Sequence, residues 1–207
     1  MKSTNYNFTS NEEKLIFYYL EELKDDNFIK KIIYQPESFN LFNGLEKKQF
    51  IKKQLKTKIK KKYYKNNFLI NKRIYTADFK VIWNDKKKDI LKLIQDISNN
   101  EIDRNIPFFF QKIKTNNKIE YISFLEVKGN YDKNGDQRSF LSRTQPWIWE
   151  KYNIYIQMIK PIILFKNTFI PKKIIEVMYY KKKYKNKNIG DKKYDFKYKT
   201  KNEFLNN

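Results

Sequence analysis

Two acidic side chains and one lysine have the types and spacing of a site that could act on a phosphate ester. The segment ISFLEVKGNYD, residues 122–132, places Glu126 and Lys128 two positions apart at the end of an apolar run. Side chains alternate along a strand with a period of two, so both should lie on one face. Asp78 ends the segment YTAD, which follows an earlier strand-forming run.

A divalent metal would join these residues if the two strands were neighbours. Asp78 and Glu126 could then share Mg²⁺ or Mn²⁺ through oxygen ligands, with the backbone carbonyl of Val127 as a further ligand. Lys128 could orient or deprotonate a water, or balance the charge of a phosphate. Glu13, on a predicted helix, could reach the same site as an additional ligand or water-positioning acid. Such a centre could hydrolyse a phosphodiester bond.

A structural interpretation of the same residues stays open. Glu126 and Lys128 could be a surface ion pair, which contributes little to stability, and Asp78 could be a turn acid. Glu13 stands three residues after Ser10 and fits a capping box. The interval between Asp78 and Glu126 is long for adjacent strands, and an insert at about 84–118 must be accommodated within it. The metal site therefore depends on how this insert folds.

Composition narrows the chemistry and the partner. The chain has no cysteine and no histidine, so disulfides, thiol catalysis and imidazole chemistry are excluded. The formal net charge of +22 favours a polyanion, most commonly nucleic acid. An abundance of AT-rich codons would also enrich lysine without any such partner. No apolar run has membrane-spanning length and no signal-peptide core is present, so the sequence predicts no membrane partner and a cytoplasmic protein.

The elements that must position these residues form a mixed α/β pattern. A helix is predicted from Ser10, and strand-like segments follow at 27–42, broken at Gln35-Pro36, at 73–85, at 105–129 around a turn at 115–117, and at 154–161. A helix is predicted within 86–103 and another after a loop at 136–153. Residues 162–180 have strand or helix character. The predicted fold is a small mixed central sheet flanked by helices, with a helical insert and a basic C-terminal tail.

Three ranges describe the expected domain organisation. Residues 1–9 are predicted to be a disordered lead, 10–178 a single domain, and 179–207 a basic low-complexity tail. Within the domain, the lysine-rich stretch 46–66 is either a basic helix or a long basic hairpin arm. It is interpreted either as a solvated face or as a clamp on a phosphate backbone.

The order of motifs resembles the PD-(D/E)xK nuclease superfamily, most closely the DUF1064-type endonuclease group of phages and bacteria. The segments that carry the likeness are SNEEKLIFYYLEEL, YQPESFNL, YTADFKV and FLEVKG, within residues 10–160. The resemblance implies a restriction-endonuclease-like core and functional roles for Glu13, Asp78, Glu126 and Lys128. The proline usually found before the aspartate is Ala77 here.

The resemblance implies a DNA endonuclease dependent on Mg²⁺ or Mn²⁺, with a role in phage-type recombination, replication or processing and, if phage-encoded, a place in the host cytoplasm. Nucleic-acid contacts are predicted at Arg138, Arg143 and Gln145, and at Lys60, Lys61 and Lys62. Cleavage of branched or junction DNA would favour a homodimer, because two symmetric cuts need two sites. The alternatives are a non-catalytic nucleic-acid-binding protein and an RNA-processing nuclease.

Overall fold

The structure is a computed structural model that describes residues 6–54, 60–115, 118–129, 135–175 and 199–206. The chain divides into two compact units, where the sequence predicted a single domain over 10–178. Unit 1 comprises residues 1–36 and 77–207, and unit 2 comprises residues 37–76. Unit 2 is separate because its long strands pair mainly with each other.

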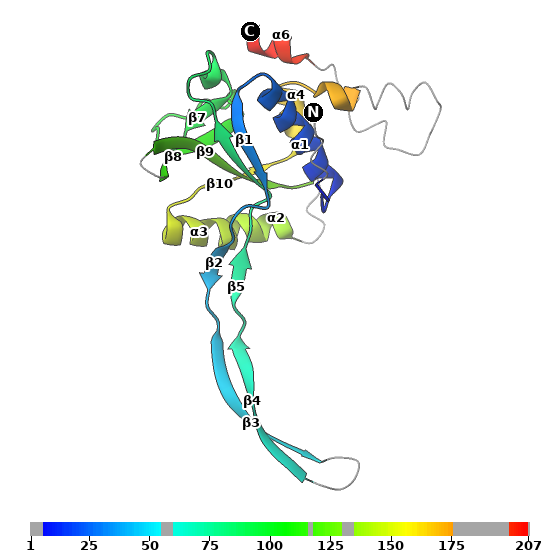
Figure 1. The fold of residues 1–207 in the computed structure, drawn as a ribbon, viewed down its shortest axis with the longest axis vertical. Helices are drawn as coiled ribbons and strands as arrows, with labels where there is room; N and C mark the ends of the chain where they lie inside the picture. Colours follow the sequence, from blue (N-terminus) through cyan, green and yellow to red (C-terminus); the bar gives the residue numbers. More distant parts are fainter. Residues whose placement is uncertain (1–5, 55–59, 116–117, 130–134, 176–198, 207) are drawn as a thin grey trace, which may run out of the picture. The chain divides into compact units, whose positions relative to one another are not determined.

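Unit 1 is built on a mixed six-stranded sheet flanked by helices (Figure 1). Its elements are α1 (Asn11–Asp25), β1 (Ile29–Tyr34), β6 (Phe79–Trp83), η1 (Ile90–Lys92), β7 (Ile94–Asp96), β8 (Phe108–Thr115), β9 (Lys118–Val127), α2 (Asp136–Ser139), η2 (Phe140–Thr144), α3 (Gln145–Tyr152), β10 (Ile156–Ile159), α4 (Pro161–Asn167) and α6 (Lys201–Asn206). The strand order is β1-β6-β9-β8-β7, and β10 also pairs with β9. The predicted α/β class is therefore confirmed.

Strand β9 is the centre of this sheet because it pairs with three neighbours. It runs antiparallel to β6 and β8 and parallel to β10. Its first part, up to Ile122, pairs with β8, whereas the part from Phe124 to Val127 pairs with β10. The two ends of β9 thus have different partners, and the end that carries Glu126 lies between β6 and β10.

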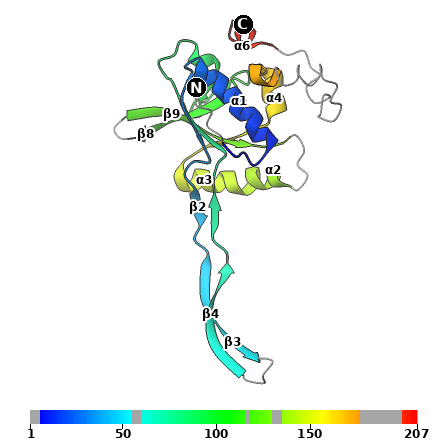
Figure 2. The ribbon, with the colours of Figure 1, turned by 45° about the vertical axis from the view of Figure 1, so that its right-hand side comes forward.

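Helix α1 covers one face of the sheet and begins as predicted. Ser10 is its N-cap, with a side chain that accepts a hydrogen bond from the amide of Glu13 at 3.1 Å. Ile16 and Leu20 on α1 are fully buried in the main core, beside Phe79 and Val81 of β6. Figures 1 and 2 show α2 and α3 on the side of the sheet away from α1.

The ends of the chain extend this core. Tyr6 and Phe8, within the predicted disordered lead, pack against it, with the Tyr6 ring edge-on to Phe17 and the Phe8 ring tilted against it. Most of the predicted basic tail lies outside the described residues, but α6 at its end contributes Phe204 to the same core. Lys201 of α6 is buried and pairs with Glu22, in the last turns of α1, and with Asp26, the C-cap of α1.

The prediction of a helical insert at about 84–118 was wrong. A single 3-10 turn at Ile90–Lys92 is followed by the short strand β7, and β8 completes the insert. Asp89 has a left-handed backbone with φ +62°, so a regular right-handed helix cannot continue through this residue. Leu93 and Ile94 are adjacent and both fully buried, a pattern that suits a covered strand better than an amphipathic helix.

Two further boundaries differ from expectation. The predicted single strand 73–85 is two strands, β5 and β6, and the break between them contains Asp78. The predicted loop before α3 is helical from residue 136, because η2 is a π-helical turn that joins α2 to α3. Such turns are frequent at functional sites.

Unit 2 consists of two antiparallel ribbons in series, a short one followed by a long one. Strands β2 (Phe39–Phe42) and β5 (Arg73–Tyr75) form the first, and β3 (Leu45–Gln54) and β4 (Lys60–Ile70) form the second. Gly44 joins them with φ +81°, and a Cβ there would lie 2.7 Å from the carbonyl oxygen of Ile70. Only glycine fits this position. The lysine-rich stretch is therefore a hairpin and not a helix.

No helix in the described part of the chain has both the length and the apolar character needed to cross a membrane.

A buried polar chain stabilises the β6–β9–β8 arrangement on which the site depends. The indole N–H of Trp83 donates to Ser123 Oγ at 2.7 Å, and this hydroxyl donates to the carbonyl of Phe109 at 2.5 Å. Trp83 is fully buried and Ser123 is 2% exposed. The three groups tie three adjacent strands together.

We expect Ser123→Ala to lower the free energy of unfolding by about 1–3 kcal/mol, because it leaves a buried indole N–H without its acceptor. Urea denaturation measures this. Ser142→Ala, which removes a hydroxyl from an exposed helical turn, is the control and should change stability by less than about 0.5 kcal/mol. Equal losses in the two variants would contradict the role of the buried chain.

Candidate functional site

The structure brings Asp78 and Glu126 together at the ends of neighbouring strands. Strands β6 and β9 pair directly, with Phe79 opposite Leu125, so the same register extended by one residue places Asp78 opposite Glu126. The amide of Asp78 donates to the carbonyl of Leu125 at 3.0 Å. The insert at 84–118 does not separate the strands, because it folds beyond the other end of β6.

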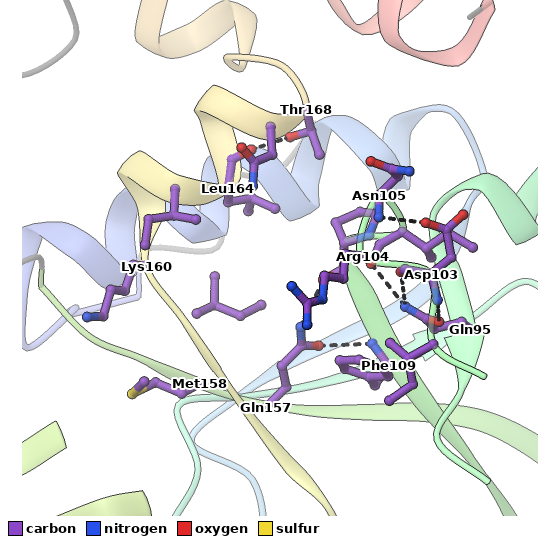
Figure 3. Close-up of a pocket in the computed structure, with 16 residues that line it drawn as sticks. Gln95, Asp103, Arg104, Asn105, Phe109, Gln157, Met158, Lys160, Leu164 and Thr168 are labelled. Atoms are coloured by element: carbon purple, nitrogen blue, oxygen red, sulfur yellow. Dashed lines mark hydrogen bonds between the residues drawn. The ribbon is translucent and has the colours of Figure 1, made fainter. Parts of the chain in front are cut away.

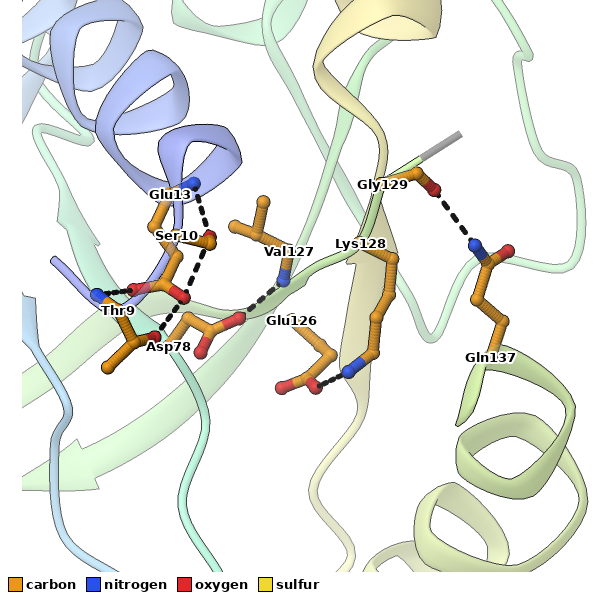
Figure 4. Close-up of polar contacts among 9 residues, drawn as sticks. All are labelled: Thr9, Ser10, Glu13, Asp78, Glu126, Val127, Lys128, Gly129 and Gln137. Carbon is orange, nitrogen blue, oxygen red and sulfur yellow. Dashed lines mark hydrogen bonds and ion pairs between the residues drawn. The ribbon is translucent and has the colours of Figure 1, made fainter. Parts of the chain in front are cut away.

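The carboxylate of Asp78 is fixed from the β9 side. The amide of Val127 donates to Asp78 Oδ2 at 2.6 Å, and the Asp78 carbonyl accepts from the amide of Gln35 at 2.8 Å. Within a strand the N–H and C=O of one residue point to the same side. The carbonyl of Val127 therefore faces the side on which Asp78 lies. Figure 4 shows Asp78 between Glu13 and Glu126.

Burial and neighbouring acids make the charge of Asp78 unfavourable. Burial and the adjacent Glu126 raise the pKa of Asp78 to about 7, although the Val127 amide and Lys128 act in the opposite direction and Glu13 adds to the rise. Two carboxylates in a poorly hydrated place repel each other unless a cation or a proton lies between them. A proton or a cation between Asp78 and Glu126 would therefore be favourable.

Glu126 and Lys128 form an ion pair, but it is not a surface pair. Lys128 Nζ lies 2.7 Å from Glu126 Oε1, and Glu126 is only 7% exposed. The amide of Lys128 donates to the carbonyl of Ile159 at 2.9 Å, which anchors the lysine to β10. Burial by itself would lower the pKa of Lys128, but the ion pair with Glu126 outweighs it and the pKa is raised. The amine is therefore a fixed cation near neutral pH.

Glu13 lies near the site but its carboxylate is already engaged. Oε1 accepts hydrogen bonds from Thr9 Oγ1 at 2.5 Å and Ser10 Oγ at 2.9 Å, and Oε2 accepts from Tyr34 Oη at 2.7 Å. Burial would raise its pKa, but these hydrogen bonds outweigh burial and hold the pKa below its ordinary value. Glu13 remains ionised, and its contact to the site is electrostatic, through Asp78.

Sequence reasoning missed three residues around the site. Thr9 and Tyr34 orient Glu13, and Gln137 on α2 is buried and donates to the carbonyl of Gly129 at 2.8 Å. Tyr34 gave little signal because the chain has 16 tyrosines. Gln137 lies in a segment for which the sequence predicts a loop. Its contact connects the chain after Lys128 to α2.

The predicted nucleic-acid contacts lie in both units. In unit 1, Arg138 on α2 and Arg143 on η2 are exposed, whereas Gln145 Oε1 accepts from the amide of Ile156 at 3.3 Å and so helps to attach α3 to β10. In unit 2, Lys60, Lys61 and Lys62 all lie on β4. The side chain of Lys62 is exposed, and those of the other two lie outside the described residues.

A separate pocket of about 280 Å³ in unit 1 is lined by residues of β10, of α4 and of the chain before β8 (Figure 3). Its wall is held by Gln157, which donates to the carbonyl of Pro107 at 2.8 Å and accepts from the amide of Phe109 at 2.9 Å. None of the four candidate residues lines it. The candidate site is thus distinct from this pocket.

The candidate site offers the donor atoms that a hard divalent cation prefers. Asp78 and Glu126 supply carboxylate oxygens, and Val127 supplies a main-chain carbonyl on the same side. In the described part of the chain, no three acidic side chains converge on one point. Mg²⁺ commonly takes one or two carboxylates and completes its shell with water and substrate phosphate oxygens. The residues present therefore fit a site that is completed by its substrate.

No protein-family model, no curated protein and no solved structure matches this chain. The function must therefore be argued from the arrangement itself, which consists of two adjacent carboxylates, one of them with a raised pKa, and a fixed ammonium. These groups can bind a divalent cation and hold an anionic substrate beside it.

We expect Asp78→Asn to stabilise the metal-free protein at high pH. The ordinary pKa of 3.8 rises to about 7 in the folded chain, so the folded state retains a proton that the unfolded state loses between these values. Stability therefore falls as pH rises from about 4 to 7, and the full penalty persists above pH 7. Asn removes the charge and still accepts from the Val127 amide.

Urea denaturation in EDTA at pH 4 and pH 8 measures this effect. The gain from Asp78→Asn should be about 2–4 kcal/mol at pH 8, from a shift of about three pKa units, and close to zero at pH 4. Glu150→Gln, at an exposed position of α3, is the control and should show no such difference. A gain that is equal at both pH values would contradict a raised pKa at Asp78.

Proposed function

We propose that this protein is a metal-dependent endonuclease that hydrolyses phosphodiester bonds in DNA, on a core like that of the PD-(D/E)xK nucleases. The proposal is supported by the order in which the chain presents its acids. A helix bears Glu13, the residue just before β6 is Asp78, and the neighbouring β9 bears Glu126, with Lys128 immediately after the strand. These residues follow one another in the chain in the order of the nuclease motif, and Asp78 and Glu126 are also neighbours in space.

The observation that carries the proposal is the proximity of Asp78 to Glu126. A fold without a ligand gains nothing from two poorly hydrated carboxylates at one sheet edge, because burial, together with repulsion from Glu126, raises the pKa of Asp78 to about 7. A divalent cation would reverse the sign of this interaction. The same residues that destabilise the empty site would then hold the ion.

Each side chain has a distinct role in this proposal. Asp78 and Glu126, with the Val127 carbonyl, would hold Mg²⁺ or Mn²⁺. The ion would stabilise the charge that develops on the phosphate and supply an acidified water. Lys128, as a fixed ammonium, would hold a phosphate oxygen or orient the water rather than remove its proton. Glu13 would keep the end of α1 in place and contribute negative charge without being a direct ligand.

Charge outside the site supports a nucleic-acid substrate. The net charge is +22, and Arg138 and Arg143 are exposed on the helical segment that follows the site. Arginine binds phosphate oxygens in a bidentate manner. We extend the proposal to DNA processing in recombination or replication, with a homodimer where the substrate is a junction.

One observation favours a non-catalytic nucleic-acid-binding protein instead. In the described part of the chain the acids do not form a cluster of three, and Glu126 already has Lys128 as a partner. If Glu126 and Lys128 stay paired, no metal binds at Glu126. The protein would then bind nucleic acid through its basic residues without cleaving it. An RNA-processing nuclease would use the same site on a different substrate.

Cleavage of supercoiled plasmid and of a matched RNA tests the proposal. With Mg²⁺ or Mn²⁺ we expect nicking of DNA that EDTA abolishes. Asp78→Asn and Glu126→Gln should each reduce the rate at least about 100-fold, because each removes a ligand charge while preserving shape. Glu150→Gln is the control and should cleave as wild type does.

Three results would count against this function. Nicking that survives both substitutions would point to a contaminating nuclease, and the absence of nicking with intact DNA binding would favour the non-catalytic alternative. Faster cleavage of RNA than of DNA would favour the RNA-processing alternative.

Lys128→Ala separates the role of the amine from that of the acids. We expect cleavage to fall about 100-fold or more, while the affinity for Mn²⁺ is unchanged or increased, because the ammonium no longer competes for Glu126. Glu126→Gln should lower both quantities. Electron paramagnetic resonance of Mn²⁺ measures the binding. A parallel loss of Mn²⁺ affinity in both variants would mean that Lys128 only positions Glu126.

A further inference from the structure

The hairpin β3–β4 of unit 2 is a long two-stranded ribbon that is open on both faces. Ten residue pairs join its strands, from Leu45 opposite Ile70 to Gln54 opposite Lys60. At about 3.3 Å per residue the paired part is about 33 Å long. Where side chains are described, nearly all are exposed, including Tyr64 at 71% and Phe50 at 45%. Figures 1 and 2 show the ribbon as a single layer.

The charge of this ribbon opposes its own stability. Residues 45–70 contain ten lysines and a single acid, Glu46. The register places Lys52 opposite Lys62 and Lys53 opposite Lys61. Like charges directly opposite each other destabilise a pair of strands, and a lone two-stranded hairpin is marginally stable in water. A polyanion would remove this repulsion.

Uncharged side chains on the ribbon can make contacts other than ionic ones. The rings of Phe50 and Tyr64 pair across the strands at 5.3 Å, and Ile51 lies opposite Tyr63 on the other face. Beside them is a hollow of about 590 Å³. Its lining includes Lys47, Lys48, Gln49, Lys65, Asn66 and Asn67. Lysines suit phosphate oxygens, and amide side chains suit the edges of bases.

We propose that the β3–β4 hairpin binds duplex DNA as a β-ribbon lying in the major groove. The major groove of B-DNA admits a two-stranded β-ribbon, and one helical turn spans about 34 Å, close to the length of the paired strands. Lysines along both strands contact the phosphates on either side of the groove. The inference deepens the proposed function by naming the duplex as substrate, and it rests on that function only for what is cut.

The geometry of the ribbon distinguishes B-form DNA from other nucleic acids. The major groove of an RNA duplex is too deep and narrow for side chains to read. A single strand is bound by aromatic rings on which successive bases stack, but the exposed rings of this ribbon are divided between its faces, with Phe50 and Tyr64 on one and Tyr63 on the other. Duplex DNA is the ligand that engages the lysines of both strands together.

Binding in EDTA tests the ribbon separately from cleavage. The test variant changes Lys47, Lys48, Lys62 and Lys65 to Gln, all exposed residues of the hairpin. The control variant changes four exposed lysines of unit 1, Lys86, Lys88, Lys114 and Lys166, to Gln and so has the same net charge. Fluorescence anisotropy measures affinity for a 20-base-pair DNA duplex, the matched RNA duplex and the single DNA strand.

We expect the hairpin variant to bind duplex DNA about 10- to 100-fold more weakly, with a shallower salt dependence by about one unit of slope per lysine in contact. The control variant should lose less than about threefold. Wild type should prefer duplex DNA to both other ligands. Equal losses in the two variants, or tighter binding of RNA duplex or single strand, would overturn the proposal.

The result is distinguishable from failure of the proposed function. If the hairpin binds the duplex but wild type with Mg²⁺ does not cleave it, the proposed DNA binding by the hairpin is supported and the proposed nuclease activity is contradicted. If cleavage persists and both lysine variants bind alike, the nuclease activity is supported and DNA binding by the hairpin is contradicted.

Discussion

The pairing of β6 with β9 is the constraint on which the candidate site depends. It places two carboxylates opposite each other where the strands end, and the Val127 amide fixes one of them at 2.6 Å. The repulsion between these carboxylates destabilises the fold, so hydrophobic burial elsewhere must offset it. The buried chain from Trp83 through Ser123 to Phe109 keeps the strands in register despite it.

The ion pair between Glu126 and Lys128 is a second consequence of that constraint. Lys128 pairs with Glu126, whereas burial and repulsion from Glu126 raise the pKa of Asp78 to about 7 even though Lys128 acts in the opposite direction. Under the proposed function, a divalent cation would meet one carboxylate whose pKa is raised to about 7 and one that is paired with lysine. Its binding would displace a proton from the first and weaken the ion pair of the second, which would couple metal affinity to pH.

Whether a feature of the fold or of the candidate site could be predicted from the sequence depended on whether it arises from a local pattern or from contacts between distant segments. Alternation in FLEVKG predicted that Glu126 and Lys128 lie on one face at the end of a strand. Ser10 with Glu13 predicted the start of α1. Both are local patterns. The insert after Trp83 was misjudged, since tertiary burial of Leu93 and Ile94 overrode a helical spacing. Tyr34 and Gln137 were missed because their roles arise only from contacts between distant segments.

The lysine-rich stretch left a choice between helix and hairpin that charge could not decide. Its register and the glycine at residue 44 settle that choice in favour of a ribbon. The two units then show opposite electrostatic imbalances within one chain. Unit 1 places two carboxylates side by side at a sheet edge, with Lys128 as a partner for one of them, and unit 2 concentrates lysines on a two-stranded hairpin. Under the two proposals, a divalent cation would offset the first imbalance and a polyanion the second. A metal ion bound to a nucleic-acid phosphate would supply both charges.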